Sequence, residues 1–484
     1  MEGNTGTVDT LRIGGRLLMN NNAFPHRHRI GFCRREVLQA GFSAAMGLTL
    51  QDLAQSRPAA AADGAGFGSA KHVIVVWIPG GPSQMQLWDL KPDSPTQARG
   101  TAKPISTSAP GVEIGHVLPK VARRMHHIAL VRSLTLGAED DNHEIGHQKM
   151  LAGLRTRVPG ATIHDSRKDW PSLGSVIGAL RPVESGLPSS IHMPIRMTHR
   201  GVPFSGETAG MLGGRFDPWL ISGDPNEASF RVPDLMPLAG FTLDRLSGRR
   251  KLLSEIDAHR RDLDRDDQIS KLDSVHQRAF EISTSSRTRD AFDLSKEPAA
   301  LRDRYGRHLY GQSLILARRL VESGVRFVQA NMGPMNSWDW HNDEDEYIGR
   351  QLPPWDQAFS SLLDDLEARG LLKETLVLAM SEMGRNPILG RSVTGAAANA
   401  ANPGGRNHWQ NCWSMAFAGA GIRGGTVVGK SDELAGFPDG DGYYPNDVAA
   451  TVYHAMGIDP RTEVRDYESR PIVINDGTPI RGLF

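Results

Sequence analysis

The 484-residue sequence has few cysteines, few aromatic residues, no excess of either charge and no long hydrophobic run. Its two cysteines, Cys33 and Cys412, cannot supply the several cross-links of a disulfide scaffold. Because 55 basic residues balance 55 acidic ones, the positive field that attracts nucleic acid is missing, and no nucleic-acid partner is expected. No apolar run reaches the roughly 20 residues that a membrane-spanning helix needs, so no integral membrane span is expected.

The remaining composition is that of an ordinary globular protein, with 39% hydrophobic and 23% charged residues. At roughly 100 to 200 residues per domain, the chain is long enough for one large domain or for two or three smaller ones. A protein of this kind can bury a full core, and an enzyme-sized globular fold is the default expectation.

The first 62 residues have the pattern of an export signal. Residues 33–39 read Cys-Arg-Arg-Glu-Val-Leu-Gln and resemble a twin-arginine motif, although the first residue is Cys where that motif has Ser or Thr. About eleven weakly apolar residues, 40–50, and small residues near 60–62 follow. We therefore predict export to the periplasm or the cell exterior by the twin-arginine route. An N-terminal helix with a tail is the alternative interpretation, and Met19 is an alternative start.

From residue 72 onward, short β-branched runs alternate with helical patterns. The predicted strands are His72–Pro79, His127–Leu134, Val325–Asn331, Thr375–Ser381, Trp413–Gly419 and Pro471–Asn475. The first and fourth are almost continuously apolar, which is typical of strands covered on both faces of a parallel sheet. Helices are predicted over Gly311–Ser323 and Pro354–Arg369, because each has helical apolar spacing and is followed by glycine. The predicted fold class is therefore α/β.

Other segments are expected to lie outside this alternation. Residues 155–240 and 385–407 are dense in Pro and Gly, which predicts long loops over the sheet. The stretch 248–304 is rich in Arg, Asp, Leu and Ile, and it is predicted to be a helical insertion with a charged, solvated outer face.

Polar side chains gather at the ends of the predicted strands, where ligands bind in open parallel sheets. The segments that follow or flank a strand end are Gly80-Gly81-Pro82, His143 to His147, Trp338 to His341, Ser381 to Arg385, and Arg406 to Trp409. Several imidazoles and carboxylates should therefore converge, and this mixture of ligands suits zinc, manganese or iron. The candidate metal ligands are Asp339, His341, Glu382 and His408, with His143 beside them.

One short motif points to a different chemistry. His143-Glu144-x-x-His147 has the spacing of the zinc metallopeptidase helix, in which two His bind one ion and Glu activates water. Residue 153 is Gly where the extended form of that motif needs His, and no apolar helix precedes it. A zinc peptidase is therefore a third and distant hypothesis.

A family resemblance covers nearly the whole chain after the export segment. The segments that carry it are Gly80-Gly81-Pro82-Ser83, Trp88 to Pro92, Arg304 to Arg307, Gly311-Gln312, Ala317 to Glu322, Trp338 to His341, Ser381 to Arg385, Asn407 to Trp409, and Gly457 to Pro460. In these segments the sequence resembles the exported domain-of-unknown-function 1501 family, which is related to alkaline phosphatases and sulfatases. The resemblance implies an alkaline phosphatase-like α/β/α sandwich over 63–484, with the helical insertion around 248–304.

Two segments support the relation to sulfatases, and residues that differ from the sulfatase pattern at two places limit it. Lys373–Gly384 resembles the sulfatase strand that ends in Ser-Asp-His-Gly, which places Glu382 at a metal ligand. The run His143 to Gly153 has the spacing of the sulfatase nucleophile element, which places His143 at the nucleophile and His147 at its arginine. No Ser, Thr or Cys is present at 143, and Pro79 to Gly81 stand where an acidic ligand is expected.

These residues lead to two functional hypotheses. The first is a metal-dependent hydrolase of phosphate or sulfate esters, in which Asp339, His341 and His408 hold a divalent metal, zinc first and manganese or calcium as alternatives. Its substrate would be a small anionic ester, Arg385 would clamp the anionic group, and His143 would be a general base, an extra ligand or a nucleophile. The second is a non-catalytic exported binding protein on a degraded hydrolase scaffold.

Overall fold

An eight-stranded sheet forms the centre of the protein in the computed structural model, which describes residues 64–137, 142–156, 164–183, 187–199, 201–232, 235, 248, 286–390 and 404–484. In spatial order its strands are β14 (Val427–Val428), β4 (Ile128–Leu134), β13 (Trp413–Ala418), β10 (Thr375–Met380), β1 (His72–Trp77), β9 (Phe327–Asn331), β5 (Ser190–Met193) and β8 (Trp219–Leu220).

The sheet is largely parallel, as predicted. Strand β1 pairs in parallel with β10 and β9, and β5 pairs in parallel with β9 and β8. Strand β13 is the exception, since it runs antiparallel to both β10 and β4. All residues of β1 and β10 are buried, which explains why their sequences are apolar without alternation.

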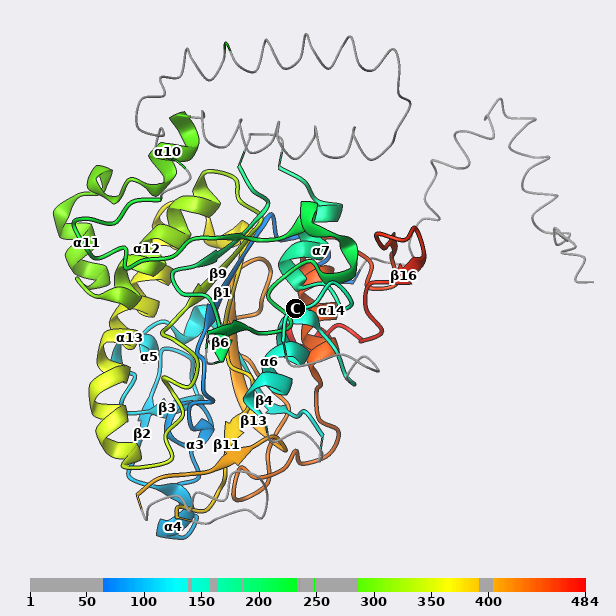
Figure 1. The fold of residues 1–484 in the computed structure, drawn as a ribbon. Coiled ribbons are helices and arrows are strands. Elements are labelled where there is room, and N and C mark those ends of the chain that lie inside the picture. The colour runs from blue at the N-terminus through cyan, green and yellow to red at the C-terminus, as the bar shows by residue number, and fades with distance from the viewer. Residues whose placement is uncertain are drawn as a thin grey trace, which may run out of the picture. The chain divides into compact units, whose positions relative to one another are not determined.

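Helices cover the sheet on both faces (Figure 1). One layer contains α5 (Pro119–Ala122), α11 (Ala299–Tyr305), α12 (Leu309–Glu322) and α13 (Glu344–Ala368), and the other contains α6 (His143–Ala152), α7 (Leu173–Leu180) and α14 (Pro445–Ala455). Each layer packs its apolar side chains against one face of the sheet, so that two hydrophobic clusters lie on either side of it. The predicted α/β/α sandwich is confirmed.

Shorter elements complete the described chain. They are α3 (Gln84–Leu87), α4 (Thr96–Arg99), α10 (Ser286–Phe292), the pair β2 (Pro104–Ser106) and β3 (Glu113–Gly115), the pair β6 (Thr198–His199) and β7 (Val202–Pro203), the pair β11 (Gly384–Arg385) and β12 (His408–Trp409), and the pair β15 (Glu463–Arg465) and β16 (Pro471–Val473). The predicted strand Pro471–Asn475 thus belongs to a small hairpin rather than to the central sheet.

Three further elements differ from the sequence prediction. Helix α13 begins at Glu344 and contains Pro353 and Pro354, whereas the sequence predicts a start at Pro354. Three acidic residues in its first turn favour the earlier start, because they interact favourably with the helix dipole. Strands β5 and β8 lie within the predicted loop 155–240, and they are too short to show a periodic signal. Strand β5 pairs with β9, and β8 pairs with β5.

Several sequence predictions lie outside the described residues. They are the export segment 1–62, short parts of the first predicted loop 155–240, most of the helical insertion 248–304, of which α10 and part of α11 are described, and residues 391–403 of the second predicted loop. The described residues belong to one unit, Gly64–Phe484. Among the residues that the structure describes, no helix combines the length and the apolar character needed to cross a bilayer.

Candidate metal centre and active site

The candidate site lies at the edge of the sheet where the parallel strands end. Gly80 follows β1, Asp339 and His341 follow β9, and Glu382 follows β10. His408 instead precedes β13, and it reaches the same edge because β13 runs antiparallel to β10. The reversed direction of β13 therefore explains how a residue before a strand joins residues that come after strands.

Three side chains form a donor triangle, which we define as Asp339 Oδ1, His341 Nε2 and His408 Nε2. The carboxylate oxygen lies 3.0 Å from His341 Nε2 and 3.3 Å from His408 Nε2, and the two nitrogens lie 3.1 Å apart. Ligand atoms around a tetrahedral zinc ion with bonds of roughly 2.0 to 2.1 Å are separated by about 3.3 Å. The three donor atoms are therefore spaced as ligands of one small divalent ion would be.

A third imidazole, that of His143, lies on the inner side of the triangle. Its Nε2 is 3.2 Å from Asp339 Oδ2, and its ring is centred 4.1 Å from the ring of His408. Donor atoms of His143, Asp339 and His408 lie within 4.8 Å of one another, so this group could also contribute to a metal site. The residue types, imidazole and carboxylate, suit zinc or a related transition ion.

Glu382 supports His143 from behind and is completely buried. Its Oε1 accepts hydrogen bonds from His143 Nδ1 at 2.7 Å and from the Gly80 amide at 2.7 Å, and Ser381 Oγ donates to its Oε2 at 3.0 Å. Because Glu382 holds Nδ1, the ring of His143 is turned so that Nε2 faces Asp339. Such a carboxylate behind an imidazole fixes both its orientation and its tautomer.

Arg385 holds Asp339 in place, and its side chain is fully buried. Its guanidinium donates to Asp339 Oδ1 and to the Gly80 carbonyl, and Nε donates to the Gly81 carbonyl at 2.6 Å. A further donor points to the Arg406 carbonyl at 3.3 Å. The guanidinium is thus bonded on all sides to the protein, which differs from the expected clamp on an anionic ligand.

A glycine lets the two loops of the site approach each other. Gly80 has a φ of 119°, and a Cβ added there would lie 2.6 Å from the Asp339 amide nitrogen. Any other residue would push the Asp339 loop away from β1. The Trp338 amide donates to the Pro79 carbonyl at 3.0 Å across the same contact. Glycine at position 80 is therefore required by the close packing of the site.

Helix α6 begins at His143 and delivers it to the site. The side chain of Asn142 caps the helix, because its Oδ1 accepts from the Glu144 amide at 2.8 Å. One turn further on, a Cβ added to Gly146 would lie 2.9 Å from the Glu382 carbonyl oxygen. The close approach at Gly146 keeps α6 against the end of β10, where His143 meets Glu382.

The electrostatics of the site follow from these contacts. Burial disfavours a charge on His143, but Asp339 and Glu382 outweigh it and raise the pKa of His143 to about 9. Burial also opposes ionisation of Asp339 and Glu382, yet Arg385 and His143 hold the pKa of Asp339 well below its ordinary value, and His143 lowers the pKa of Glu382. Burial lowers the pKa of His408, which favours a neutral, metal-binding ring.

The solvent reaches the site from the side of His341. Its side chain is 24% exposed, compared with 12% for Asp339 and for His408 and 6% for His143. The donor triangle therefore has an open side next to His341, while His143 forms its inner wall. A catalytic metal site needs such an open position for water or substrate.

The structure separates the predicted site residues into three groups. Asp339, His341 and His408 meet directly, together with His143. Glu382 lies behind His143, with Oε1 engaged by two donors and Oε2 by Ser381. His147 turns away from the site and contacts Glu207 at 2.9 Å. Because the two histidines of α6 face different carboxylates, they do not share one ion as in a metallopeptidase.

Two partners of these residues are not among the site residues that the sequence predicts. Asn407 Oδ1 lies 3.0 Å from His341 Nδ1, on the side of that ring opposite the triangle. Glu207, which meets His147, lies in the segment that the sequence predicts to be a loop. Asn407 is next to His408 in the sequence, and this position could have indicated it. No spacing rule relates Glu207 to His147.

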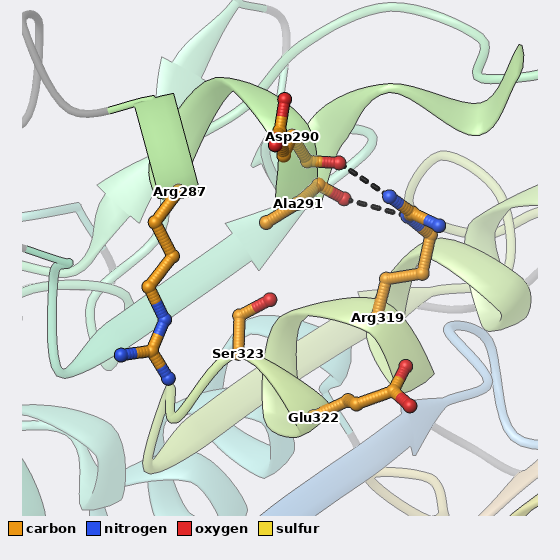
Figure 2. Close-up of a pocket in the computed structure, with 6 residues that line it drawn as sticks. All are labelled: Arg287, Asp290, Ala291, Arg319, Glu322 and Ser323. Atoms are coloured by element: carbon orange, nitrogen blue, oxygen red, sulfur yellow. Dashed lines mark hydrogen bonds between the residues drawn. The ribbon is translucent and has the colours of Figure 1, made fainter. Parts of the chain in front are cut away.

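A separate pocket of about 350 Å³ lies between α10 and the end of α12 (Figure 2). The figure shows Arg319 turned toward the backbone carbonyls of Asp290 and Ala291, to which it donates hydrogen bonds. Since α12 ends just before β9 begins, this pocket lies at the opposite edge of the sheet from the candidate site. It shares no residue with the donor triangle.

The fold and site define an α/β protein with a central, mostly parallel sheet and a histidine and carboxylate cluster at its carboxyl edge. The chain belongs to the family described as Protein of unknown function (DUF1501), whose sequence model matches residues 70–484. This confirms the family that the sequence motifs indicate. A comparison with curated proteins finds no match.

Solved structures with a similar fold include three bacterial proteins. The lipoteichoic acid synthase LtaP from Listeria monocytogenes has 9% identity and a TM-score of 0.38, with 87% of this chain and 80% of that chain covered. A sulfatase from Pseudoalteromonas sp. has 12% identity and a TM-score of 0.34, covering 87% and 72%. The alkaline phosphatase from the Antarctic bacterium TAB5 has 10% identity and a TM-score of 0.34, covering 81% and 99%.

Proposed function

We propose that the protein is a metal-dependent hydrolase that acts on small phosphate or sulfate esters. The observation that carries this proposal is the donor triangle of Asp339, His341 and His408, whose sides of 3.0, 3.1 and 3.3 Å match the spacing of ligands around a tetrahedral ion. One carboxylate and two imidazoles favour zinc, with manganese or calcium as weaker candidates.

A divalent ion at this triangle would polarise an ester oxygen and lower the pKa of a water molecule toward roughly 7. The protein supplies the rest of the site. Asp339 is held by Arg385, and the ring of His341 is oriented by Asn407 at 3.0 Å. These partners keep the donor atoms in place before a substrate arrives, so that little reorganisation is needed.

His143 is the group that we assign to proton transfer. Its pKa of about 9 means that it holds a proton at neutral pH in the protein without metal, and Nε2 is the nitrogen that faces the triangle. When water adds to phosphorus or sulfur and the ester bond breaks, the leaving oxygen takes the proton from Nε2. The proton that water loses then restores His143.

Arg385 is a positioning residue in this proposal. Because its donors are occupied by Asp339 and by backbone carbonyls, the anionic group of a substrate would instead be bound by the ion and by His143. The resemblance of Lys373–Gly384 to a sulfatase strand and of His143 to Gly153 to a nucleophile element supports the choice of ester substrates.

Export by the twin-arginine route is part of the same proposal. It is supported by the Cys33–Gln39 motif and by the apolar and small residues that follow it. A fusion of residues 1–62 to a reporter that must fold before export would test this directly. Replacement of both Arg34 and Arg35 by Lys should retain the reporter in the cytoplasm, whereas export of that variant would contradict the proposal.

The enzymatic proposal is tested with purified protein and an array of phosphate and sulfate monoesters and diesters, after removal of metal and its replacement by zinc, manganese or calcium. We expect turnover that disappears in Asp339→Ala and His408→Ala and persists in His116→Ala, which changes an exposed histidine elsewhere. Metal binding without turnover of any ester would instead favour a non-catalytic binding protein, the second hypothesis. Wild-type protein that binds no metal would contradict both the metal site and the hydrolase.

A further inference from the structure

A second cluster of buried polar groups lies next to the candidate site, around the carboxylate of Glu207. Its Oε1 accepts from His147 Nε2 at 2.9 Å and from Gln329 Nε2 at 3.1 Å, and its Oε2 lies 3.1 Å from His192 Nδ1. All four side chains are 0 or 1% exposed. A carboxylate so deeply buried needs partners of this kind to offset its loss of hydration.

The four residues come from four separate parts of the fold. His147 is on α6, His192 on β5 and Gln329 on β9, while Glu207 is on the loop that follows β7. Burial would raise the pKa of Glu207, but His192 and His147 outweigh it and hold that pKa far below the ordinary value. The ionised carboxylate therefore ties α6 to the two strands beneath it.

The cluster does not resemble a metal site of its own. Among the residues that the structure describes, the group of three or more donors within 4.8 Å of one another is the one formed by His143, Asp339 and His408. The ring of His147 instead packs edge to face against Trp77, the last residue of β1, with 5.1 Å between ring centres. The contacts of His147 with Glu207 and Trp77 thus hold α6 in its position.

Helix α6 connects this cluster to the candidate site. His143 and His147 are four residues apart, so they lie on the same face of the helix, one turn above the other. His147 is fixed by Glu207, and His143 meets Glu382 and Asp339. A rotation or a shift of α6 along its axis would therefore displace both imidazoles together.

We propose that Glu207 is a positioning residue for the active site, which holds α6 through His147 so that His143 Nε2 faces Asp339. This inference rests on the proposed function, because it assumes that the placement of His143 matters for metal binding and proton transfer. Removing the charge of Glu207 should leave the fold in place but release His143 from its present orientation.

The direct test is nuclear magnetic resonance of metal-free protein with ¹⁵N-labelled histidine, in which loss of signals in His143→Gln assigns the ring of residue 143. In Glu207→Gln we expect the ring signals of His143 to move or broaden by more than their linewidth. The matched control is Glu297→Gln, which removes a buried carboxylate that pairs with Arg318 at 2.9 Å on α12. This control should leave the signals of His143 unchanged.

Unchanged signals of His143 in a folded Glu207→Gln protein would overturn the inference, and so would equal shifts in the control. If Glu207→Gln does not fold, Gln329→Met removes a single donor to Glu207, and a smaller shift of the same signals is expected. This experiment needs neither metal nor substrate. The positioning role of Glu207 can therefore be confirmed even if the hydrolase proposal is wrong, and it can be refuted even if the hydrolase proposal is right.

A second measurement separates positioning from a general loss of stability. Zinc affinity measured by calorimetry, at a temperature where every variant is folded, should fall about 10-fold to 100-fold in Glu207→Gln. In a His143→Ala background, the same Glu207→Gln change should have no further effect, because Glu207 acts through His143. An equal loss of affinity in both backgrounds would show that Glu207 acts on the site by some other route.

Discussion

Raising the pH removes the proton of His143 and should weaken the folded protein. In the metal-free state, His143 bridges Glu382 on Nδ1 and Asp339 on Nε2, and both contacts are strongest when the ring is charged. Deprotonation leaves the buried Glu382 and the partly buried Asp339 with one fewer positive partner, which is costly where the dielectric is low. The effect should be absent in His143→Gln, which has no titrating ring.

The magnitude follows from the two pKa values of His143. In the folded protein the pKa is about 9, and in the unfolded chain it is close to the ordinary 6.5. Because the folded value is the higher one, the stabilisation is complete below about pH 6.5 and is lost as the pH rises through about 9. At roughly 1.4 kcal/mol per pKa unit, the loss is on the order of 3 kcal/mol.

The assay is urea unfolding of wild-type protein and of His143→Gln at pH 6 and at pH 10, in the presence of a chelator. The difference between the two proteins isolates His143, since all other groups titrate in both. We expect the free energy of unfolding of the wild type to fall by on the order of 3 kcal/mol more than that of the variant. Equal losses in the two proteins would refute the charge assigned to His143.

Three substitutions test other contacts of the site. Gly146→Ala places a Cβ 2.9 Å from a backbone carbonyl oxygen and should lower the free energy of unfolding by about 1 to 3 kcal/mol in urea titrations. The control Gly349→Ala, whose Cβ would meet nothing within 4 Å, should not lower it. Equal effects of the two substitutions would contradict the close packing of α6. Asn407→Ala should reduce zinc affinity by about 10-fold to 100-fold in calorimetry with little change in stability, and an unchanged affinity would show that Asn407 does not orient His341. Arg385→Gln removes the guanidinium from the partly buried Asp339 carboxylate, which then keeps His143 as its positive partner, and should cost about 3 kcal/mol in thermal unfolding, so a loss under about 1 kcal/mol would contradict its role.

The sequence predicts the fold well where burial dominates. The continuous apolar runs of β1 and β10 and the glycines after α12 and α13 are local signals. The structure places the two strands as expected and ends the two helices next to those glycines. Strands β5 and β8 were missed because two to four residues cannot show a period. Strand β5 forms by pairing with β9, more than one hundred residues away in the chain, and β8 forms by pairing with β5.

The candidate site is predicted only in part. The sequence shows which residues lie at the ends of strands, but it does not show which side chains contact each other there. Asp339, His341 and His408 converge as the strand-end rule suggests. That rule applies to parallel strands, however, and His408 obeys it only because β13 is reversed. The separation of His143 from His147 depends on Glu207, whose place under α6 is set by tertiary packing and leaves no trace in local spacing.

Titration of zinc into metal-free protein, followed by calorimetry and elemental analysis, measures whether Asp339, His341 and His408 bind an ion. We expect one ion bound per chain in the wild type, with loss of that ion in Asp339→Ala, His341→Ala and His408→Ala and full binding in His116→Ala. A wild type that binds no ion, or a triple variant at the donor triangle that binds zinc as tightly as the wild type, would contradict this expectation.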